Sequence, residues 1–299
     1  MFNLNGYLNK AEVNNVNEVN DLFKIEIIEI FIDIIKNRQM FSEDNFKFYY
    51  YDEFILDTAV GKNNIATLYV EINQPDNISK IINNSTQKSN SKNKIVAPDL
   101  HFSLSAMREE LYNASIKRFN KDTLIWNEKY SVNYAHNIQS DDGTINTYYF
   151  KVIPCITYKN LNNVNGIMYY NETKSLIEIE YPKLSVLNFN LKNKITNGLY
   201  KDFVIMFKNI FMFEKKVNEL PFEIFEIILY NVPDEIFIDK TIETFYKIIN
   251  YVRNFNIKDY QSLDKQDYAF TSQTKSLSVI YAGHVIKKVS SYLRKLNNK

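Results

Sequence analysis

The sequence predicts an α+β lobe followed by a helical lobe. Between residues 46 and 181, short runs rich in aromatic and β-branched residues are separated by turn-forming residues, which is the pattern of strands. After Pro182 the apolar residues recur at helical spacing. Strands that precede a group of helices are typical of an α+β architecture. We therefore expect two domains, over residues 1–190 and 191–299.

The elements of the first lobe begin with a helix over residues 21–38, where isoleucine, leucine and phenylalanine recur at helical spacing. A polar segment over 76–98 has too little apolar surface to offset the entropy cost of ordering, so we expect an exposed, mobile loop. A second helix is expected over 103–120. The other expected elements are strands over 46–51, 65–72, 125–134, 148–156, 166–170 and 176–181, and C-terminal helices over 200–213, 222–229, 240–254 and 275–293.

The composition argues against several classes of protein. The net charge is +1, from 36 basic and 35 acidic residues, which gives no strong signal for nucleic-acid binding through counterion release. The single Cys155 excludes an internal disulfide and a multi-cysteine zinc site. The chain has no run of 18 uncharged apolar residues and no signal-peptide pattern at its N-terminus. We therefore expect a cytoplasmic protein that does not enter a membrane.

Three patterned segments follow one another between residues 149 and 234. They are Phe-Lys-Val-Ile-Pro-Cys over 150–155, Lys-Asn-x-x-Thr-x-x-x-Tyr-Lys over 192–201 with Phe-Lys-Asn over 207–209, and Ile-Leu-Tyr-Asn-Val-Pro-Asp over 228–234. In this order they resemble the cGAS/DncV-like nucleotidyltransferases (CD-NTases), which synthesise cyclic oligonucleotides. The resemblance covers roughly residues 20–290. It implies a nucleotidyltransferase (polymerase-beta-like) mixed-sheet lobe packed on a helical C-terminal lobe.

Active members of this superfamily hold two magnesium ions with two carboxylates on one strand and a third on its neighbour, because hard cations bind clustered carboxylate oxygens. In this chain the corresponding strand is Ala-Thr-Leu-Tyr-Val-Glu-Ile over 66–72. Depending on the register, its metal positions hold Thr67 and Tyr69, or Tyr69 and Glu71, while Lys151 takes the third position. At most one carboxylate remains, so the resemblance implies no catalytic residue and no metal ligand at these positions.

Four lysines are candidates for nucleotide binding: Lys151, Lys192, Lys201 and Lys208. Lys201 and Lys208 are seven residues apart, which places both on one face of a helix, as a shared ligand would require. Lys151 could neutralise a bound phosphate directly, without metal. The alternatives are an ion pair of Lys151 with Glu71 or Asp57, and ordinary solvated lysines on the helices.

Three hypotheses about function stay open. The first is a catalytically impaired CD-NTase relative that needs no cofactor, binds a nucleotide or cyclic dinucleotide, or acts as a partner or decoy subunit in antiviral signalling. The second is an active cyclic-oligonucleotide synthase that uses magnesium in a rearranged site, with Glu71 joined by Asp52, Glu53 or Asp57. The third is a structural module that binds a protein partner. A protein partner or a homo-oligomer fits the first and third hypotheses.

Overall fold

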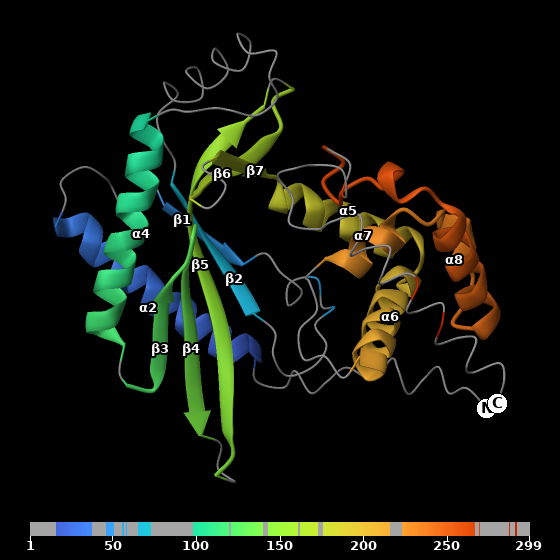
Figure 1. Ribbon diagram of the computed structural model, residues 1–299, viewed down its shortest axis with the longest axis horizontal. Helices are drawn as coiled ribbons and strands as arrows, with labels where there is room; N and C mark the ends of the chain where they lie inside the picture. Colours follow the sequence, from blue (N-terminus) through green and yellow to red (C-terminus); the bar gives the residue numbers. More distant parts are fainter. Residues whose placement is uncertain are drawn as a thin grey trace. The chain divides into compact units, whose positions relative to one another are not determined.

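The computed structural model describes residues 16–37, 46–50, 65–72, 98–119, 121–139, 143–160, 162–172, 176–215 and 223–266, with Leu56, Thr58, Ala269, Lys287 and Ser291. The chain divides into two compact units (Figure 1). We call residues 14–51 and 65–182 the sheet unit, and residues 1–13, 52–64 and 183–299 the helical unit. The domain boundary expected after residue 190 falls within helix α5 (Pro182–Ile195).

The described strands of the sheet unit form one seven-stranded mixed sheet. The strand order is β1-β2-β5-β4-β3, and β6 pairs with both β5 and β7. Strands β2 and β5 are parallel, whereas the other pairs are antiparallel. The bounds are β1 Phe46–Tyr50, β2 Ile65–Ile72, β3 Thr123–Asn127, β4 Val132–Gln139, β5 Ile145–Lys159, β6 Asn165–Asn171 and β7 Leu176–Glu180.

Strand β5 is the centre of the sheet. Its first half pairs with β4 as far as Val152, and its last residues pair with β6 from Ile156 onward. Pro154 lies between these two ladders. A proline is tolerated there because it removes an N–H where that edge of β5 has no ladder partner. The Val-Ile-Pro motif therefore marks the point where β5 changes neighbours.

Helices α2 (Val16–Asn37) and α4 (Pro98–Arg118) cover one face of this sheet. The ring of Phe23 on α2 stacks on Phe150 of β5, with centroids 3.9 Å apart. Ser115 on α4 is hydrogen bonded to the Tyr134 hydroxyl at 2.8 Å. Successive residues of a strand point to opposite faces, so Lys151 belongs to the face opposite Phe150 and the two helices.

The first described helix of the helical unit is α5, which the sequence analysis did not anticipate. Pro182 opens this helix, a position where its missing N–H costs nothing. The helix ends at a turn in which the Gly198 N–H donates to the Asn193 carbonyl at 2.7 Å, with Gly198 at φ 86°. The remaining elements are α6 Leu199–Lys215, α7 Ile224–Tyr230, α8 Ile242–Asn254 and 3₁₀ turns over Asp234–Ile236 and Ile257–Asp259.

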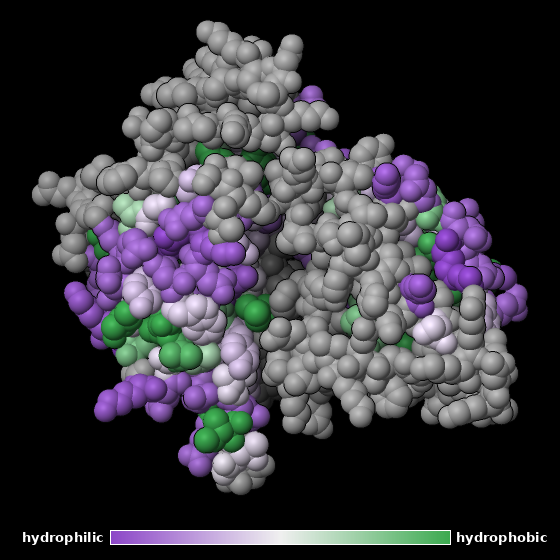
Figure 2. All heavy atoms as spheres, viewed as in Figure 1, coloured by the Kyte–Doolittle hydropathy of each residue, from purple (hydrophilic) through white to green (hydrophobic). Residues whose placement is uncertain are grey.

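Helices α6, α7 and α8 enclose the apolar core of the helical unit. Large buried side chains fill this core, including Phe203, Phe207, Phe211, Phe225, Phe245 and Ile248. Figure 2 shows hydrophilic residues over the outer side of α8, as expected for an amphipathic helix. Among the described residues, no helix combines the length and the apolar character that a membrane crossing requires.

The prediction of one strand over 125–134 is wrong. Strands β3 and β4 occupy this region instead, joined by a tight turn in which the Glu128 N–H donates to the Ser131 carbonyl at 2.9 Å. The α+β class, the two helices of the sheet unit and the β6–β7 hairpin are confirmed. The loop expected over 76–98 and the helix expected over 275–293 fall almost entirely outside the described residues.

Candidate functional site

The strand register brings Thr67, Lys151 and Asn133 into one row across three neighbouring strands. Thr67 on β2 lies opposite Lys151 on β5, and Lys151 lies opposite Asn133 on β4. Side chains of opposed residues share one face of a sheet and start about 5 Å apart. Two of the positions that the resemblance assigns to metal ligands are therefore direct neighbours, and both belong to the face away from α2 and α4.

The register also decides which residues of β2 lie near Lys151. Tyr69 follows Thr67 on the same face after ~7 Å, whereas Glu71 is ~13 Å from Thr67 along the strand. Glu71 pairs with Cys155, is only 3% exposed and accepts a hydrogen bond from the Thr157 hydroxyl at 2.9 Å. The sequence left two pairs of residues open for the metal positions of β2. Of these, Thr67 and Tyr69 lie closer to Lys151 than Tyr69 and Glu71 do.

The Lys151 ammonium contacts Tyr130. It lies 5.4 Å from the centroid of the ring and donates to the hydroxyl over 3.5 Å, which is long for a hydrogen bond. Burial lowers the pKa of Lys151, while the negative charges of Glu128 and Glu180 oppose this shift. Glu71 is not the ion-pair partner of Lys151 in the structure. Asp57, the other expected partner, lies outside the described residues.

Asn133 is a site residue that the sequence analysis missed. It is 3% exposed, and its Oδ1 accepts a long hydrogen bond of 3.4 Å from Ser131. Its Nδ2 has no hydrogen-bond partner among the described residues. Nothing in the sequence distinguishes this asparagine from the many others in the chain, and only the sheet register reveals that it lies next to Lys151.

A network of tyrosines and glutamates occupies the end of the sheet formed by β6 and β7. The Tyr169 hydroxyl lies 2.9 Å from Glu178 Oε2 and 2.7 Å from Glu180 Oε1. The Tyr69 hydroxyl donates to the other oxygen of Glu180 at 3.0 Å. Burial, followed by these two carboxylates, raises the pKa of Tyr169 well above its ordinary value, so it stays a hydrogen-bond donor. Tyr69 therefore donates to Glu180, which also accepts from Tyr169.

The helical unit holds the other three candidate lysines. Lys192 on α5 donates to the Val232 carbonyl at 2.6 Å and to Asp234 Oδ1 at 2.7 Å. Its ammonium also lies between 5.3 and 5.8 Å from the centroids of three aromatic rings, those of Tyr200, Tyr230 and Phe237. Burial lowers the pKa of Lys192, and the bond to Asp234 opposes this shift. Two of its three N–H groups are thus used within the unit.

Lys208 on α6 is fully buried. Its ammonium donates to Glu226 Oε1 at 2.5 Å and to the carbonyl and hydroxyl oxygens of Thr58 at 3.3 and 3.4 Å. Lys201, which is the other candidate lysine on α6, is half-buried. Lys208 has no exposed surface here. To share a ligand with Lys201, the Lys208 side chain would therefore have to leave the ion pair with Glu226.

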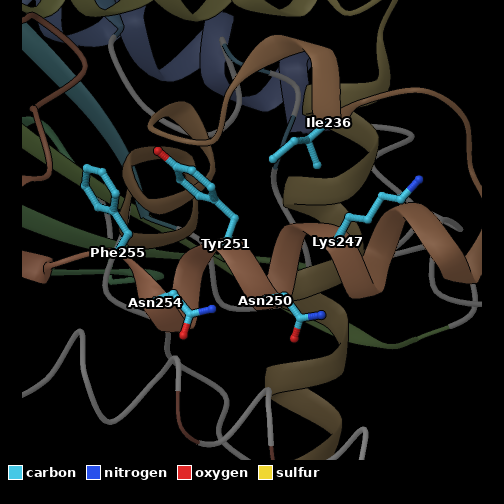
Figure 3. A pocket seen from close by; sticks show the side chains of 6 residues that line it. All are labelled: Ile236, Lys247, Asn250, Tyr251, Asn254 and Phe255. Carbon is cyan, nitrogen blue, oxygen red and sulfur yellow. The ribbon is translucent and has the colours of Figure 1, made fainter.

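An open hollow of about 470 Å³ lies beside α8 in the helical unit. The Tyr251 and Phe255 rings stack at 5.4 Å on one side of it, whereas Asn250 and Asn254 point the other way (Figure 3). Lys247 at its edge is already paired with Glu243 at 2.8 Å. None of the candidate site residues lines this hollow, and it shows no buried polar group that awaits a ligand.

The described residues do not fit the two magnesium ions that the fold implies. At the four positions in question they supply one carboxylate, Glu71, and an ammonium that repels cations, Lys151. Within the described part of the chain, no group of three or more histidine, cysteine, aspartate or glutamate side chains is placed to hold a metal ion. Asp52, Glu53 and Asp57, which the active-enzyme hypothesis requires, lie outside the described residues.

The mixed sheet followed by a helical unit defines a nucleotidyltransferase fold. Residues 187–294 match the family model of the cGAS/DncV-like nucleotidyltransferase C-terminal helical domain. This match supports the resemblance in the C-terminal part of the chain, which contains two of the three motifs, over 192–209 and 228–234.

The chain is similar to one characterised protein over part of its length and to solved structures over nearly all of it. A cyclic UMP-AMP synthase of Rhodothermus marinus is 29% identical over 131 residues, which span 40% of this chain and 46% of that protein. The R. marinus CdnE c-UMP-AMP synthase, solved with Apcpp and Upnpp, has a TM-score of 0.70 at 16% identity and covers 98% and 95% of the two chains. The Elizabethkingia meningoseptica CdnE cyclic dinucleotide synthase, solved with GTP and Apcpp, has a TM-score of 0.65 at 16% identity and covers 98% and 99%. At this identity the structural matches establish the fold alone.

Proposed function

We propose that this chain is a CD-NTase family protein that binds a nucleotide or cyclic dinucleotide and does not catalyse nucleotidyl transfer. The observation that carries the proposal is Lys151 directly opposite Thr67, with Tyr69 as the next residue on that face. Active relatives need carboxylates at such positions to hold two cations. Here the same positions carry an ammonium, a hydroxyl and a phenol.

The expected loss of activity is large. Bound metal ions stabilise the transition state of phosphoryl transfer by several kcal/mol. Because each 1.4 kcal/mol is about tenfold in rate, the loss of most metal ligands should lower turnover by roughly a thousandfold or more. A protein of this kind would act by binding, as a partner or decoy subunit in cytoplasmic antiviral signalling.

Turnover is tested by incubating the purified chain with Mg²⁺ or Mn²⁺ and labelled nucleoside triphosphates, singly and in pairs. We expect no cyclic or linear product above a protein-free blank. The matched control is Glu71→Gln, which removes the one carboxylate among the four positions while keeping its shape. Robust product formation by the native chain would refute the proposal, and its disappearance with Glu71→Gln would support the active-enzyme hypothesis.

Binding is tested by thermal unfolding in the presence of each nucleotide and of cyclic dinucleotides. A ligand at 100 times its dissociation constant adds about 2.7 kcal/mol to the free energy of unfolding. We expect at least one nucleotide to raise the melting temperature in a concentration-dependent way. If no nucleotide does so, the remaining hypothesis is a structural module that binds a protein partner.

A further inference from the structure

Two neighbouring side chains, the buried Asn133 on β4 and the half-buried Lys151 on β5, have hydrogen-bond donors without adequate acceptors. Asn133 Nδ2 carries two N–H groups and has no partner among the described residues. The Lys151 ammonium carries three, and its polar contact within the described part of the chain is the Tyr130 hydroxyl at 3.5 Å. Buried polar groups in folded proteins are nearly always hydrogen bonded, so an acceptor is missing from this place.

The register places the donors of both residues on one face, where one ligand can bond to both. Because Asn133 and Lys151 are opposed in the register, their side chains start about 5 Å apart on the same face. Thr67 faces Lys151 from the other side and places a hydroxyl at the end of the row. A positive charge flanked by an amide N–H₂ and a hydroxyl favours an oxygen-rich anion, and a tetrahedral phosphate presents several acceptor oxygens.

We infer that Lys151 and Asn133 bind a phosphate group directly, without a divalent cation. This inference rests on the proposed function, since it assigns the phosphate of the bound nucleotide to this row. Burial lowers the pKa of Lys151, whereas the negative charges of Glu128 and Glu180 oppose this shift and favour the charged ammonium, as a bound phosphate would. Glu180 itself accepts hydrogen bonds from Tyr69 and Tyr169, so its two oxygens are occupied by phenol donors.

The test measures the dissociation constants of the four ribonucleoside triphosphates and of inorganic tripolyphosphate by isothermal titration calorimetry. Each titration is run once in EDTA and once in excess Mg²⁺. We expect tripolyphosphate and at least one nucleotide to bind in EDTA, with no more than about a threefold gain from Mg²⁺. A site built on carboxylates would instead lose binding in EDTA.

Two variants address the row, and each has a matched control on the same strand. Lys151→Met is compared with Lys159→Met, an exposed position on β5, and Asn133→Asp with Asn137→Asp, an exposed position on β4. Loss of charged hydrogen bonds should weaken binding about 10- to 100-fold for Lys151→Met. Asn133→Asp should weaken it comparably, because the new carboxylate pairs with Lys151 and repels phosphate. If Lys151→Met does not fold, as judged by circular dichroism, Lys151→Gln takes its place.

Each outcome separates this inference from the proposed function. Nucleotide binding that requires Mg²⁺, or that Lys151→Met and Asn133→Asp leave unchanged, overturns the inference while the chain still binds nucleotide. If no nucleotide binds but tripolyphosphate binds in EDTA and depends on Lys151, the proposed function fails and the phosphate site stands. If nothing binds in EDTA, the inference is wrong.

Discussion

Replacement of Lys208 by methionine should destabilise the helical unit severely. In the structure Lys208 is 0% exposed and donates to Glu226 Oε1 and to two oxygens of Thr58. Glu226 is equally buried, and its Oε2 has no hydrogen-bond partner among the described residues. Without the lysine, Glu226 would retain one hydrogen bond, from the Thr58 hydroxyl at 2.6 Å, as compensation for a buried charge.

The magnitude follows from the cost of an uncompensated buried ion. Removing one partner of a buried ion pair costs about 3–5 kcal/mol, although the intact pair itself adds little net stability. For a protein of this size, that loss corresponds to a decrease of roughly 6–20 °C in melting temperature. The double variant Lys208→Met with Glu226→Leu should regain most of the loss, because no buried charge then remains.

The assay is thermal and urea-induced unfolding followed by circular dichroism. The matched control is Lys247→Met on α8, which removes an exposed pair with Glu243 and should change the free energy of unfolding by less than about 0.5 kcal/mol. A loss below about 1 kcal/mol for Lys208→Met would refute the reasoning. A double variant that is as unstable as the sum of the two single changes would do the same.

Three further perturbations test other contacts. Lys192→Met should cost about 2–3 kcal/mol in urea unfolding, because two short charged hydrogen bonds are lost, whereas exposed Lys194→Met should be neutral. Burial lowers the pKa of His136, so the unfolded chain binds more protons than the folded chain. The free energy of unfolding should therefore fall as pH decreases through about 6.5. In unfolding curves measured from pH 8 to 5, His136→Gln should reduce this dependence of the free energy of unfolding on pH. Gly166→Ala should destabilise the β6–β7 pairing, because a Cβ would lie 2.7 Å from the backbone oxygen of Glu180, and limited proteolysis of native and variant chains checks this expectation.

Much of the fold was predictable because residue periodicity reports directly on strands and helices. The two failures have specific physical causes. The turn between β3 and β4 contains neither glycine nor proline, so residues 125–134 looked like one strand. Helix α5 was missed because its apolar residues lie on more than one side: Phe189 is buried, whereas Leu187 and Leu191 are 62% and 52% exposed. The simple pattern of one apolar face is therefore lost.

The candidate site was only partly predictable, because strand register and long-range partners are not encoded in local spacing. The sequence identified Lys151 and Thr67 but left two registers open, and β2–β5 pairing was needed to place them side by side. It could not reveal that Lys208 meets Glu226, or that Lys192 meets Asp234, which lies 42 residues further along the chain. A lysine that binds phosphate and one that pairs with a buried carboxylate look alike in sequence.

The exchange of metal-binding carboxylates for Lys151 that we propose would separate two properties that a metal site couples. A magnesium ion both attracts the phosphates and orients the attacking and leaving oxygens through fixed coordination. An ammonium on a flexible stem supplies the attraction but imposes no such geometry. Binding should therefore survive the exchange and become independent of divalent cations, whereas catalysis should not. Binding without a metal ion needs more than one contact, because a lysine acting alone would offer a phosphate charge without a second point of attachment. The buried amide of Asn133 beside Lys151 supplies that second point.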